Sequence, residues 1–494
     1  MAIGVDLGTT AAKALACTTE GRVVAEASER YGVTSPQPGY VEQDANVVCL
    51  AAARAAARAI HDAAGRGGIA AIGFSSAMHG LVAVDDRGEP LGPYITWMDR
   101  RSTAIAQAWH NDGTAARLYA RTGAPMHPML PLCKLRWLAT EAPALFARAR
   151  RFVSMKELLI FRWTGQWLVD HGIASATGLF DLRERRWDEE ALALAGVDQS
   201  RLSQPARPTT TLRRIRPDVA SSVGLGTPTG LVLGSSDGAL ANLGAGAIDP
   251  GATALTLGTS GAVRAVTPVP MFDRDGRTFC YAFDDTRSLV GGPTSSAGGV
   301  FDWLSALLLP DVPVERRFEA AVSLAMEVSE GADGLIMLPF LSGERAPYWY
   351  GDLRGAFVGL DLSHDRRHLL RAGLESLIYA VRTVSDVVST LIGAPSALLL
   401  SGGLTHSPAI RRLVADIFGV ETWLASTDEA SAYGAAVMAA VAVGALPGLD
   451  SVHRLLSYPE RLAPRPEAHR RYEEIYRRYG QIVEAILPLW HPTA

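Results

Sequence analysis

The apolar positions of the first hundred residues come in short runs separated by turn residues, which is the pattern of strands joined by hairpins. Between these runs, Asp44 is placed to cap a helix that extends to about residue 64, where Gly65 ends it. Alternating strands, hairpins and helices are typical of an α/β domain. The predicted strands are 3–7, 14–18, 22–27, 69–74 and 81–84.

The second half of the chain repeats the beginning. A strand at 253–257 runs into a Gly-Thr turn, and Leu257-Gly258-Thr259-Ser260 matches Leu7-Gly8-Thr9-Thr10 at an offset of 250 residues. We therefore predict an internal duplication, with two similar lobes that face one cleft. The boundary is expected at 244–251, where several glycines can act as a hinge. The segment 100–215 is predicted to be mostly helical, with its tryptophans in packing positions.

Composition excludes several functional classes. The 494 residues are 48% hydrophobic, enough for two or three domains with full-sized cores and no disulfide staples. With 47 basic and 51 acidic residues the net charge is −4, which argues against a general nucleic-acid binder. Among the basic residues only Lys13, Lys134 and Lys156 are lysines, which we attribute to coding bias.

Neither a membrane protein nor a secreted protein is indicated. The N-terminus has no basic region and no long apolar core, so it does not resemble a signal peptide. The longest apolar stretch, Ala435–Leu446, is shorter than the roughly 20 residues that a membrane span needs, and it predicts a buried helix. The cysteines are too far apart for a zinc ribbon or a CxxC redox motif, so we expect reduced thiols in a cytoplasmic protein. They are Cys17, Cys49, Cys133 and Cys280.

Two Gly-Thr turns suit the binding of phosphate. In Asp6-x-Gly8-Thr9-Thr10-x-x-Lys13, the glycine lets the backbone approach a phosphate, while threonine hydroxyls and amides donate to its oxygens. Lys13 supplies positive charge, and Asp6 can hold a magnesium ion through water. Gly258-Thr259 repeats the turn, and one such turn per lobe is what a clamped phosphate chain needs. A plain structural turn is the alternative interpretation, and the motif is neither a Walker motif nor a Rossmann fingerprint.

One carboxylate stands out as a candidate base. Gly234-Ser235-Ser236-Asp237-Gly238 places Asp237 in a loop after the predicted strand 231–233, where it could accept a hydroxyl proton. The alternative is that Asp237 caps the helix that follows. Ser401-Gly402-Gly403 follows another predicted strand, 397–400, and would let a flat ring or a ribose lie against the backbone.

Two further motifs suit a polyhydroxylated ligand. Met78-His79-Gly80 and Trp97-x-Asp99-x-Arg101 each follow a predicted strand. The indole can cover a carbon face of a sugar while the polar side chains hydrogen-bond its hydroxyls. The alternatives are a structural histidine and a simple Asp99–Arg101 ion pair.

Taken in order, these motifs resemble the FGGY family of carbohydrate kinases over nearly the whole chain. The run Met-Leu-Pro-Leu-Cys-Lys-Leu-Arg-Trp-Leu-Ala-Thr-Glu at 129–141 fits the family's first signature at every constrained position, including Lys134 and Trp137. Residues 355–375 resemble the second signature except at Gly373, where the family usually has a side chain with a Cβ. That departure bears on helix packing rather than on membership.

The resemblance implies an α/β fold of two actin-like, ribonuclease H-like lobes around an interdomain cleft. Residues 1–246 would bind the sugar and carry the catalytic base, and 247–494 would bind the nucleotide. ATP and Mg²⁺ are implied, with Asp237 similar to the catalytic base and Asp6 acting in catalysis as the ligand of Mg²⁺ through water. The implied sugar contacts are Met78, His79, Trp97, Asp99, Arg101 and Asp237. The implied ATP contacts are Thr9, Thr10, Lys13, Gly258, Thr259, Gly298, Gly402, Gly403 and Ser407.

The expected sugar follows from the resemblance of individual motifs to particular branches of the family. Glu344-Arg345-Ala346-Pro347-Tyr348-Trp349 and the run 237–244 resemble the gluconokinase branch. Met78-His79-Gly80 is more similar to xylulokinases, because gluconokinases often have Ser in place of Gly80. We expect an ATP-dependent kinase that converts gluconate to 6-phosphogluconate, with xylulose or another pentulose or polyol as the alternative substrate.

Two functions outside the kinases are alternatives. An actin-like ATPase would not call for the sugar motifs, and a silent sugar-binding regulator would not need an intact Asp237. The expected partner is a small sugar or sugar acid, without nucleic acid or membrane. A homodimer is left open.

Overall fold

The computed structural model describes residues 1–225, 229–427 and 429–490. The chain divides into two compact units. The first consists of Met1–Ile248, Val266–Val290 and Glu429–Ser457, and the rest of the described chain belongs to the second. A segment from near the C-terminus therefore completes the first unit. The functional division into 1–246 and 247–494 stays a prediction.

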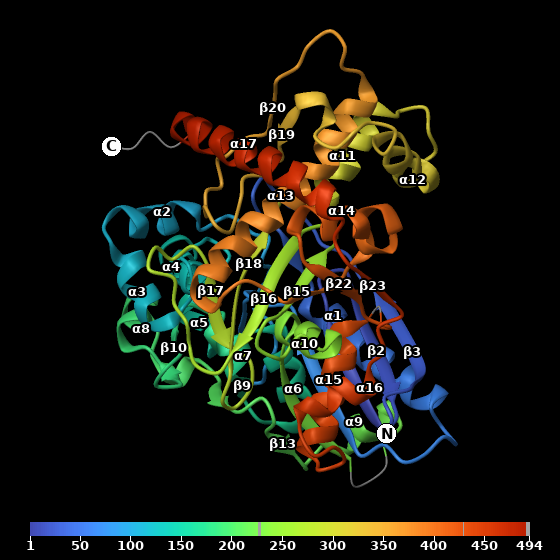
Figure 1. The fold of residues 1–494 in the computed structure, drawn as a ribbon. Coiled ribbons are helices and arrows are strands. Elements are labelled where there is room, and N and C mark those ends of the chain that lie inside the picture. Colours follow the sequence, from blue (N-terminus) through green and yellow to red (C-terminus); the bar gives the residue numbers. More distant parts are fainter. Residues whose placement is uncertain (226–228, 428, 491–494) are drawn as a thin grey trace. The chain divides into compact units, whose positions relative to one another are not determined.

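A six-stranded sheet forms the centre of the first unit (Figure 1). Strands β1 (Ala2–Leu7), β2 (Ala11–Cys17) and β3 (Val23–Arg30) are antiparallel neighbours, whereas β1, β5 (Ala71–Ser76) and β14 (Gly230–Ser236) run parallel. In the register, Leu7 at the end of β1 and Ser236 at the end of β14 both pair with Ser76 at the end of β5. The motifs that follow these strands are therefore brought to the same edge of the sheet, where α/β proteins bind ligands. The order of the strands across this sheet is β13 (Thr211–Leu212), β14, β5, β1, β2 and β3.

Helix α1 (Ala45–Asp62) covers one face of this sheet. The predicted cap is confirmed, because Asp44 Oδ1 accepts hydrogen bonds from the N–H groups of Asn46 and Val47 at 2.8 and 3.2 Å. Ile3 and Val5 share a buried core with the alanines of α1. Since side chains alternate along a strand, Gly4 between them faces the opposite side.

Helix α15 (Ala430–Ala442) packs on that opposite side through small residues. A Cβ on Gly4 would lie 1.8 Å from the carbonyl oxygen of Ala432, and one on Gly73 would lie 2.2 Å from that of Ala435. The buried helix predicted at Ala435–Leu446 is thus confirmed, although it begins and ends earlier. No helix in the described ranges is long and apolar enough to span a membrane.

Helices are the main regular elements of the segment 100–215, although loops and short strands separate them, and Trp109, Trp163 and Trp187 are buried. Its helices are α2 (Thr103–Asn111), α3 (Thr114–Thr122), α4 (Pro131–Glu141), α5 (Pro143–Arg148), α6 (Met155–Thr164), α7 (His171–Ser175) and α8 (Glu189–Ala195). Three more helices of the first unit lie later in the chain: α9 (Pro217–Val223), α10 (Asp237–Ala245) and α16 (Val452–Leu455). The first unit also has short strands outside the six-stranded sheet: β4 (Glu42–Gln43), β6 (Val82–Val84), β7 (Tyr94–Ile95), β8 (Arg151–Val153), β9 (Leu168–Asp170), β10 (Phe180–Asp181), β11 (Arg186–Trp187) and β12 (Gln204–Ala206). Strand β17 (Phe279–Ala282) pairs instead at the edge of the sheet that contains β15 and β21.

The sheet of the second unit repeats the plan of the first. Strands β15 (Ala252–Leu257) and β16 (Gly261–Thr267) form an antiparallel hairpin, and β15 runs parallel to β21 (Ala397–Ser401), which runs parallel to β22 (Glu421–Leu424). β15 therefore corresponds to β1, and the topology supports the predicted duplication. The other elements are β18 (Ser288–Thr294), β19 (Ile336–Leu338), β20 (Ala356–Val358), β23 (Glu460–Leu462), α11 (Gly298–Leu308), α12 (Val314–Ala325), α13 (Arg366–Ile392), α14 (Pro408–Phe418) and α17 (Pro466–Trp490).

The departure from the second signature at Gly373 has a packing reason. Gly373 is buried on α13, and a Cβ there would lie 2.4 Å from Cδ2 of Leu304 on α11. The glycine makes room for this leucine between the two helices.

Candidate active site

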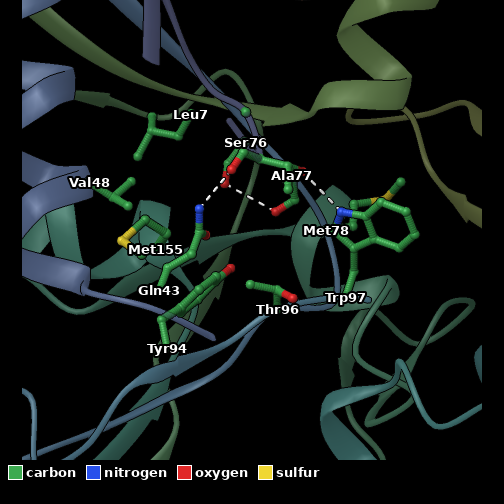
Figure 2. Close-up of a pocket in the computed structure, with 12 residues that line it drawn as sticks. Leu7, Gln43, Val48, Ser76, Ala77, Met78, Tyr94, Thr96, Trp97 and Met155 are labelled. Atoms are coloured by element: carbon green, nitrogen blue, oxygen red, sulfur yellow. Dashed lines mark hydrogen bonds between the residues drawn. The ribbon is translucent and has the colours of Figure 1, made fainter. Parts of the chain in front are cut away.

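Side chains fix the Gly-Thr turn after β1 in the first unit. The carbonyl of Thr9 accepts a hydrogen bond from Gln43 Nε2 at 2.7 Å, and its hydroxyl accepts one from Trp97 Nε1 at 3.0 Å (Figure 2). Tyr31 donates to the carbonyl of Gly8 at 2.6 Å. Trp97, predicted to contact sugar, is thereby tied to the predicted phosphate turn. No sequence motif pointed to Gln43 or Tyr31, because they act through the folded backbone.

Asp6 and Asp237 are carboxylates close enough to repel each other. Asp6 accepts a hydrogen bond from Ser75 Oγ at 2.5 Å. Burial, and then the charge of Asp237, raise the pKa of Asp6 to about 6, against the opposing effects of Ser75 and Lys13. A pair of carboxylates in this state favours a proton or a cation beside it.

Asp237 does not lie in a loop, contrary to the prediction. Strand β14 ends at Ser236 and helix α10 begins at Asp237. Ser236 is the N-cap, and its hydroxyl accepts from the N–H of Ala239 at 3.3 Å, so a capping role for Asp237 is also wrong. Serine is a strong N-cap residue, which explains why the strand passes directly into the helix. Asp237 Oδ1 instead accepts from the N–H of Gly238 at 2.7 Å, in the first turn, where the helix dipole favours negative charge.

Lys13, on β2, forms an ion pair at the same end of the first unit. Its Nζ lies 2.7 Å from Glu429 Oε1, and the two side chains are 41% and 32% exposed. Glu429 directly precedes α15. The positive charge expected near the phosphates is present, and here a carboxylate balances it. The hydroxyl-bearing Thr10 is exposed beside it.

Met78-His79-Gly80 follows β5. His79 has a φ of 66°, a backbone conformation that residues other than glycine rarely adopt. Its Nδ1 lies 2.7 Å from the carbonyl oxygen of Ala176, and because a carbonyl only accepts, Nδ1 carries the proton. The ring meets the buried Tyr281 of β17 edge-on, with centroids 5.9 Å apart. Tyr281 was missed from the sequence, where it stands far from any motif.

Gly80 has no room for a side chain. A Cβ there would lie 1.8 Å from the hydroxyl oxygen of Tyr94 and 2.0 Å from Cζ. Tyr94 is buried on β7 and lines a pocket together with Met78 and Trp97 (Figure 2). Packing against Tyr94 therefore requires glycine in this chain, whatever the substrate.

Asp99 and Arg101 form a buried ion pair, as the alternative interpretation predicts. Arg101 Nε donates to Asp99 Oδ1 at 2.8 Å, and its Nη2 donates to Asp99 Oδ2 at 2.7 Å and to Glu42 at 2.6 Å. The guanidinium also lies 3.9 Å from the ring centroid of Tyr40. Asp99 additionally accepts from the N–H of Val41 at 2.7 Å. The pair holds the Trp97 loop in shape, and direct contact with a substrate stays a prediction.

In the second unit the two predicted nucleotide loops bond to each other. The N–H groups of Gly298 and Gly299, at the start of α11, donate to the carbonyls of Gly258 and Thr259 at 2.9 Å each. A Cβ on Gly298 would lie 2.6 Å from the Gly258 carbonyl oxygen. Gly298 is therefore glycine because a turn of backbone approaches it closely.

The loop after β21 joins the same group. Gly402 has a φ of 95°, and a Cβ on it would lie 2.6 Å from the carbonyl of Leu257. At Gly403, by contrast, nothing lies within 4 Å of an added Cβ. Ser407 is the N-cap position of α14. Gly403 thus leaves open space beside the three loops, as a ligand that lies on the backbone would need.

The Glu344-Arg345 motif also belongs to the second unit. The buried Glu344 carboxylate accepts from Thr294 Oγ1 at 2.7 Å, from the N–H of Ser295 at 2.6 Å and from the N–H of Arg345 at 2.7 Å. Arg345 Nη2 donates to the carbonyl of Thr294 at 2.9 Å. The motif braces the segment that leads from β18 into α11.

The residues present suit a magnesium ion held mainly by a substrate. Across the described part of the chain, no cluster of three or more His, Cys, Asp or Glu side chains could hold a metal alone. Mg²⁺ commonly uses one or two carboxylates together with the phosphates of a nucleotide. Asp6 fits this role, since its raised pKa reflects a nearby carboxylate that a cation would offset.

Comparison with known proteins identifies the class. Residues 1–244 match the N-terminal domain of the FGGY family of carbohydrate kinases, and residues 253–443 match the C-terminal domain. The gluconokinase of Bacillus licheniformis is 34% identical over 480 residues, 96% of this chain and 93% of that protein. Two crystal structures from Lactobacillus acidophilus, of a gluconate kinase and of a ligand-bound xylulose kinase, each superpose with a TM-score of 0.94 at 32% identity, covering 100% of this chain and 99% of the other.

The chain therefore belongs to the FGGY family of carbohydrate kinases. It has the family's α/β, ribonuclease H-like (actin-like) fold, and it is a sugar kinase, a phosphotransferase that acts on a small sugar. Kinases of this family use ATP, generally with Mg²⁺. The predicted family membership, fold class and enzyme class are thus confirmed.

Proposed function

We propose that this kinase phosphorylates gluconate to 6-phosphogluconate. The observation that carries the choice is the contact between Gly80 and Tyr94. Gly80 was the sequence feature that favoured xylulose, and its identity follows from packing in this chain. The remaining gluconokinase-like motifs and the 34% identity to a gluconokinase support gluconate as the substrate.

In the proposed mechanism Asp237 acts as the base. Its carboxylate takes the proton of a terminal sugar hydroxyl while that oxygen bonds to the γ-phosphorus and the bond to ADP breaks. Bound Mg²⁺ supplies neutralisation of phosphate charge. Asp6, in its ionised form, would hold that ion through water. Thr9, Thr10 and Lys13 would donate to phosphate oxygens, and Met78, His79 and Trp97 would orient the sugar.

The nucleotide side of the proposal uses the loops of the second unit. Gly258, Thr259, Gly298, Gly402, Gly403 and Ser407 would receive ATP, with the open space at Gly403 facing the base or ribose. Asp99 and Arg101 would act through the Trp97 loop. A cytoplasmic location and a homodimer stay predictions.

The test is ADP release measured over gluconate, xylulose, ribulose and glycerol. Gluconate should exceed xylulose in kcat/KM by about 10²-fold, because a site built to pair a carboxylate rejects analogues that lack it. Asp237→Asn should keep ATP binding and lose roughly 10²-fold or more in kcat. Equal or better turnover of xylulose would overturn the gluconate assignment and leave the kinase class intact. ATP hydrolysis that no sugar stimulates would instead favour an ATPase of the same fold.

A further inference from the structure

Two of the three lysines of this chain lie in the protein interior. Three of the 47 basic residues are lysines, and two of them, Lys134 and Lys156, are 0% and 3% exposed. Buried ammonium groups are rare because desolvation is costly unless partners satisfy them. Burial accordingly lowers the pKa of Lys134 to about 7 and also lowers that of Lys156. A cost of this kind needs a compensating role, which coding bias does not supply.

Lys134, on α4, joins the two loops that carry the sugar motifs. Its Nζ donates to the carbonyl of His79 at 2.5 Å and to the carbonyl of Thr96 at 2.7 Å. His79 is the residue with the left-handed backbone, and Thr96 immediately precedes Trp97. One ammonium group thus sets the separation of the His79 and Trp97 loops.

Lys156, at the start of α6, makes the matching contact behind the base. Its Nζ donates to the carbonyl of Ser235 at 2.7 Å and lies 2.7 Å from Asp170 Oδ2. Ser235 is two residues before Asp237 on β14. The Lys156–Asp170 pair therefore anchors the strand end from which the base projects.

We propose that Lys134 and Lys156 are positioning residues with separate roles. Lys134 sets the geometry of the His79 and Trp97 loops, and Lys156 sets the position of the base, Asp237. The proposal rests on the proposed roles of His79, Trp97 and Asp237. A compact ammonium can serve two carbonyls, or a carbonyl and a carboxylate, converging on one point, whereas a planar guanidinium spreads its donors. This accounts for lysine at both positions in a chain in which only three of the 47 basic residues are lysines.

The test compares steady-state kinetics of two variants. Lys134→Met should raise KM for the sugar by about tenfold or more and leave kcat and KM for ATP within about threefold. Lys156→Met combined with Asp170→Leu, which avoids leaving a buried charge, should lower kcat by about 10²-fold with little change in either KM, since displacing a catalytic group by about 1 Å costs that much. Lys134→Gln keeps a hydrogen-bond donor and should recover part of the sugar affinity. It takes the place of Lys134→Met in the comparison if that variant does not fold.

The matched control is Arg371→Met with Glu375→Leu, another buried ion pair, joined at 2.7 Å within the second unit and outside every proposed site contact. It should lower thermal stability and leave both KM values and kcat near wild type. Parallel losses in the Lys134 and Lys156 variants, or wild-type kinetics in both, would overturn the proposal. Wild-type activity is measured first, because a wild type that phosphorylates no sugar would contradict the proposed function and not the roles of the two lysines.

Discussion

Asp6 is a partly buried carboxylate whose charge changes between pH 4 and pH 6. Its pKa is raised from 3.8 to about 6, chiefly by burial and then by Asp237. The folded state therefore binds this proton more tightly than the unfolded state, and the stability it contributes is lost as pH rises through that window. Asp6→Asn keeps an acceptor for Ser75 and removes the charge. It should be more stable than wild type by about 1–3 kcal/mol above pH 6, and this advantage should vanish below pH 4. Urea unfolding without nucleotide at pH 4, 5, 6 and 7 measures it, and a pH-independent difference would contradict the assignment.

Gly80 and Tyr94 form a pair that a double-mutant cycle can test. Gly80→Ala places a methyl group within the Tyr94 ring, so it should cost about 1–3 kcal/mol of stability. In a Tyr94→Val background the same change should cost far less, because the space is vacated. Chemical denaturation of the four proteins gives the coupling energy. Equal costs in the two backgrounds would mean that Gly80 is not required by packing, and would restore its weight as evidence on the substrate.

At the scale of elements, features set by residues close in sequence could be predicted, whereas contacts between residues far apart in sequence could not. The strands and the Asp44 cap follow from short-range patterns, and the structure confirms them. Asp237 was placed in a loop because its glycine and serine neighbours suit turns, whereas Ser236 ends the strand and caps the helix at once. The bond of Lys156 to Ser235 spans 79 residues, so no spacing rule could find it. Tyr281 was missed for the same reason.

The start of α11 shows how an element-level prediction separates two glycines. Gly298→Ala would press a Cβ against the Gly258 backbone at 2.6 Å, so it should destabilise the protein although alanine favours helices. Gly403→Ala meets nothing within 4 Å and should fold with wild-type stability. If ATP lies at this loop, Gly403→Ala should still raise KM for ATP and leave KM for the sugar unchanged. Thermal unfolding and initial rates separate the two effects, and a stable Gly298→Ala variant would contradict the packing argument.

At the scale of the whole molecule, each unit carries one hairpin turn that continues into parallel strands. The repeated Leu-Gly-Thr sequence was enough to predict this duplication, because each turn depends on local chemistry. The sequence did not indicate that Glu429–Ser457 belongs to the first unit. The chain returns to the first unit because α15 packs against Gly4 and Gly73. This contact becomes visible only when the strands and the helix are placed together.

A kinase with one phosphate turn in each unit should close when both substrates bind. Closure would bring the two turns to one phosphate chain and exclude water, limiting wasteful hydrolysis of ATP. Asp237→Asn allows ATP, Mg²⁺ and gluconate to be present together while turnover is slowed by about 10²-fold or more. In small-angle scattering, this variant should have a smaller radius of gyration with both ligands than with either alone, against about 23 Å expected for a compact chain of this length. Of the predicted hinge 244–251, Gly244 and Ala245 lie in α10, which leaves 246–251 as the expected hinge. Replacing Gly246, whose φ is 80°, should impede the change. Identical scattering curves in the free and doubly bound states would rule out closure of this kind.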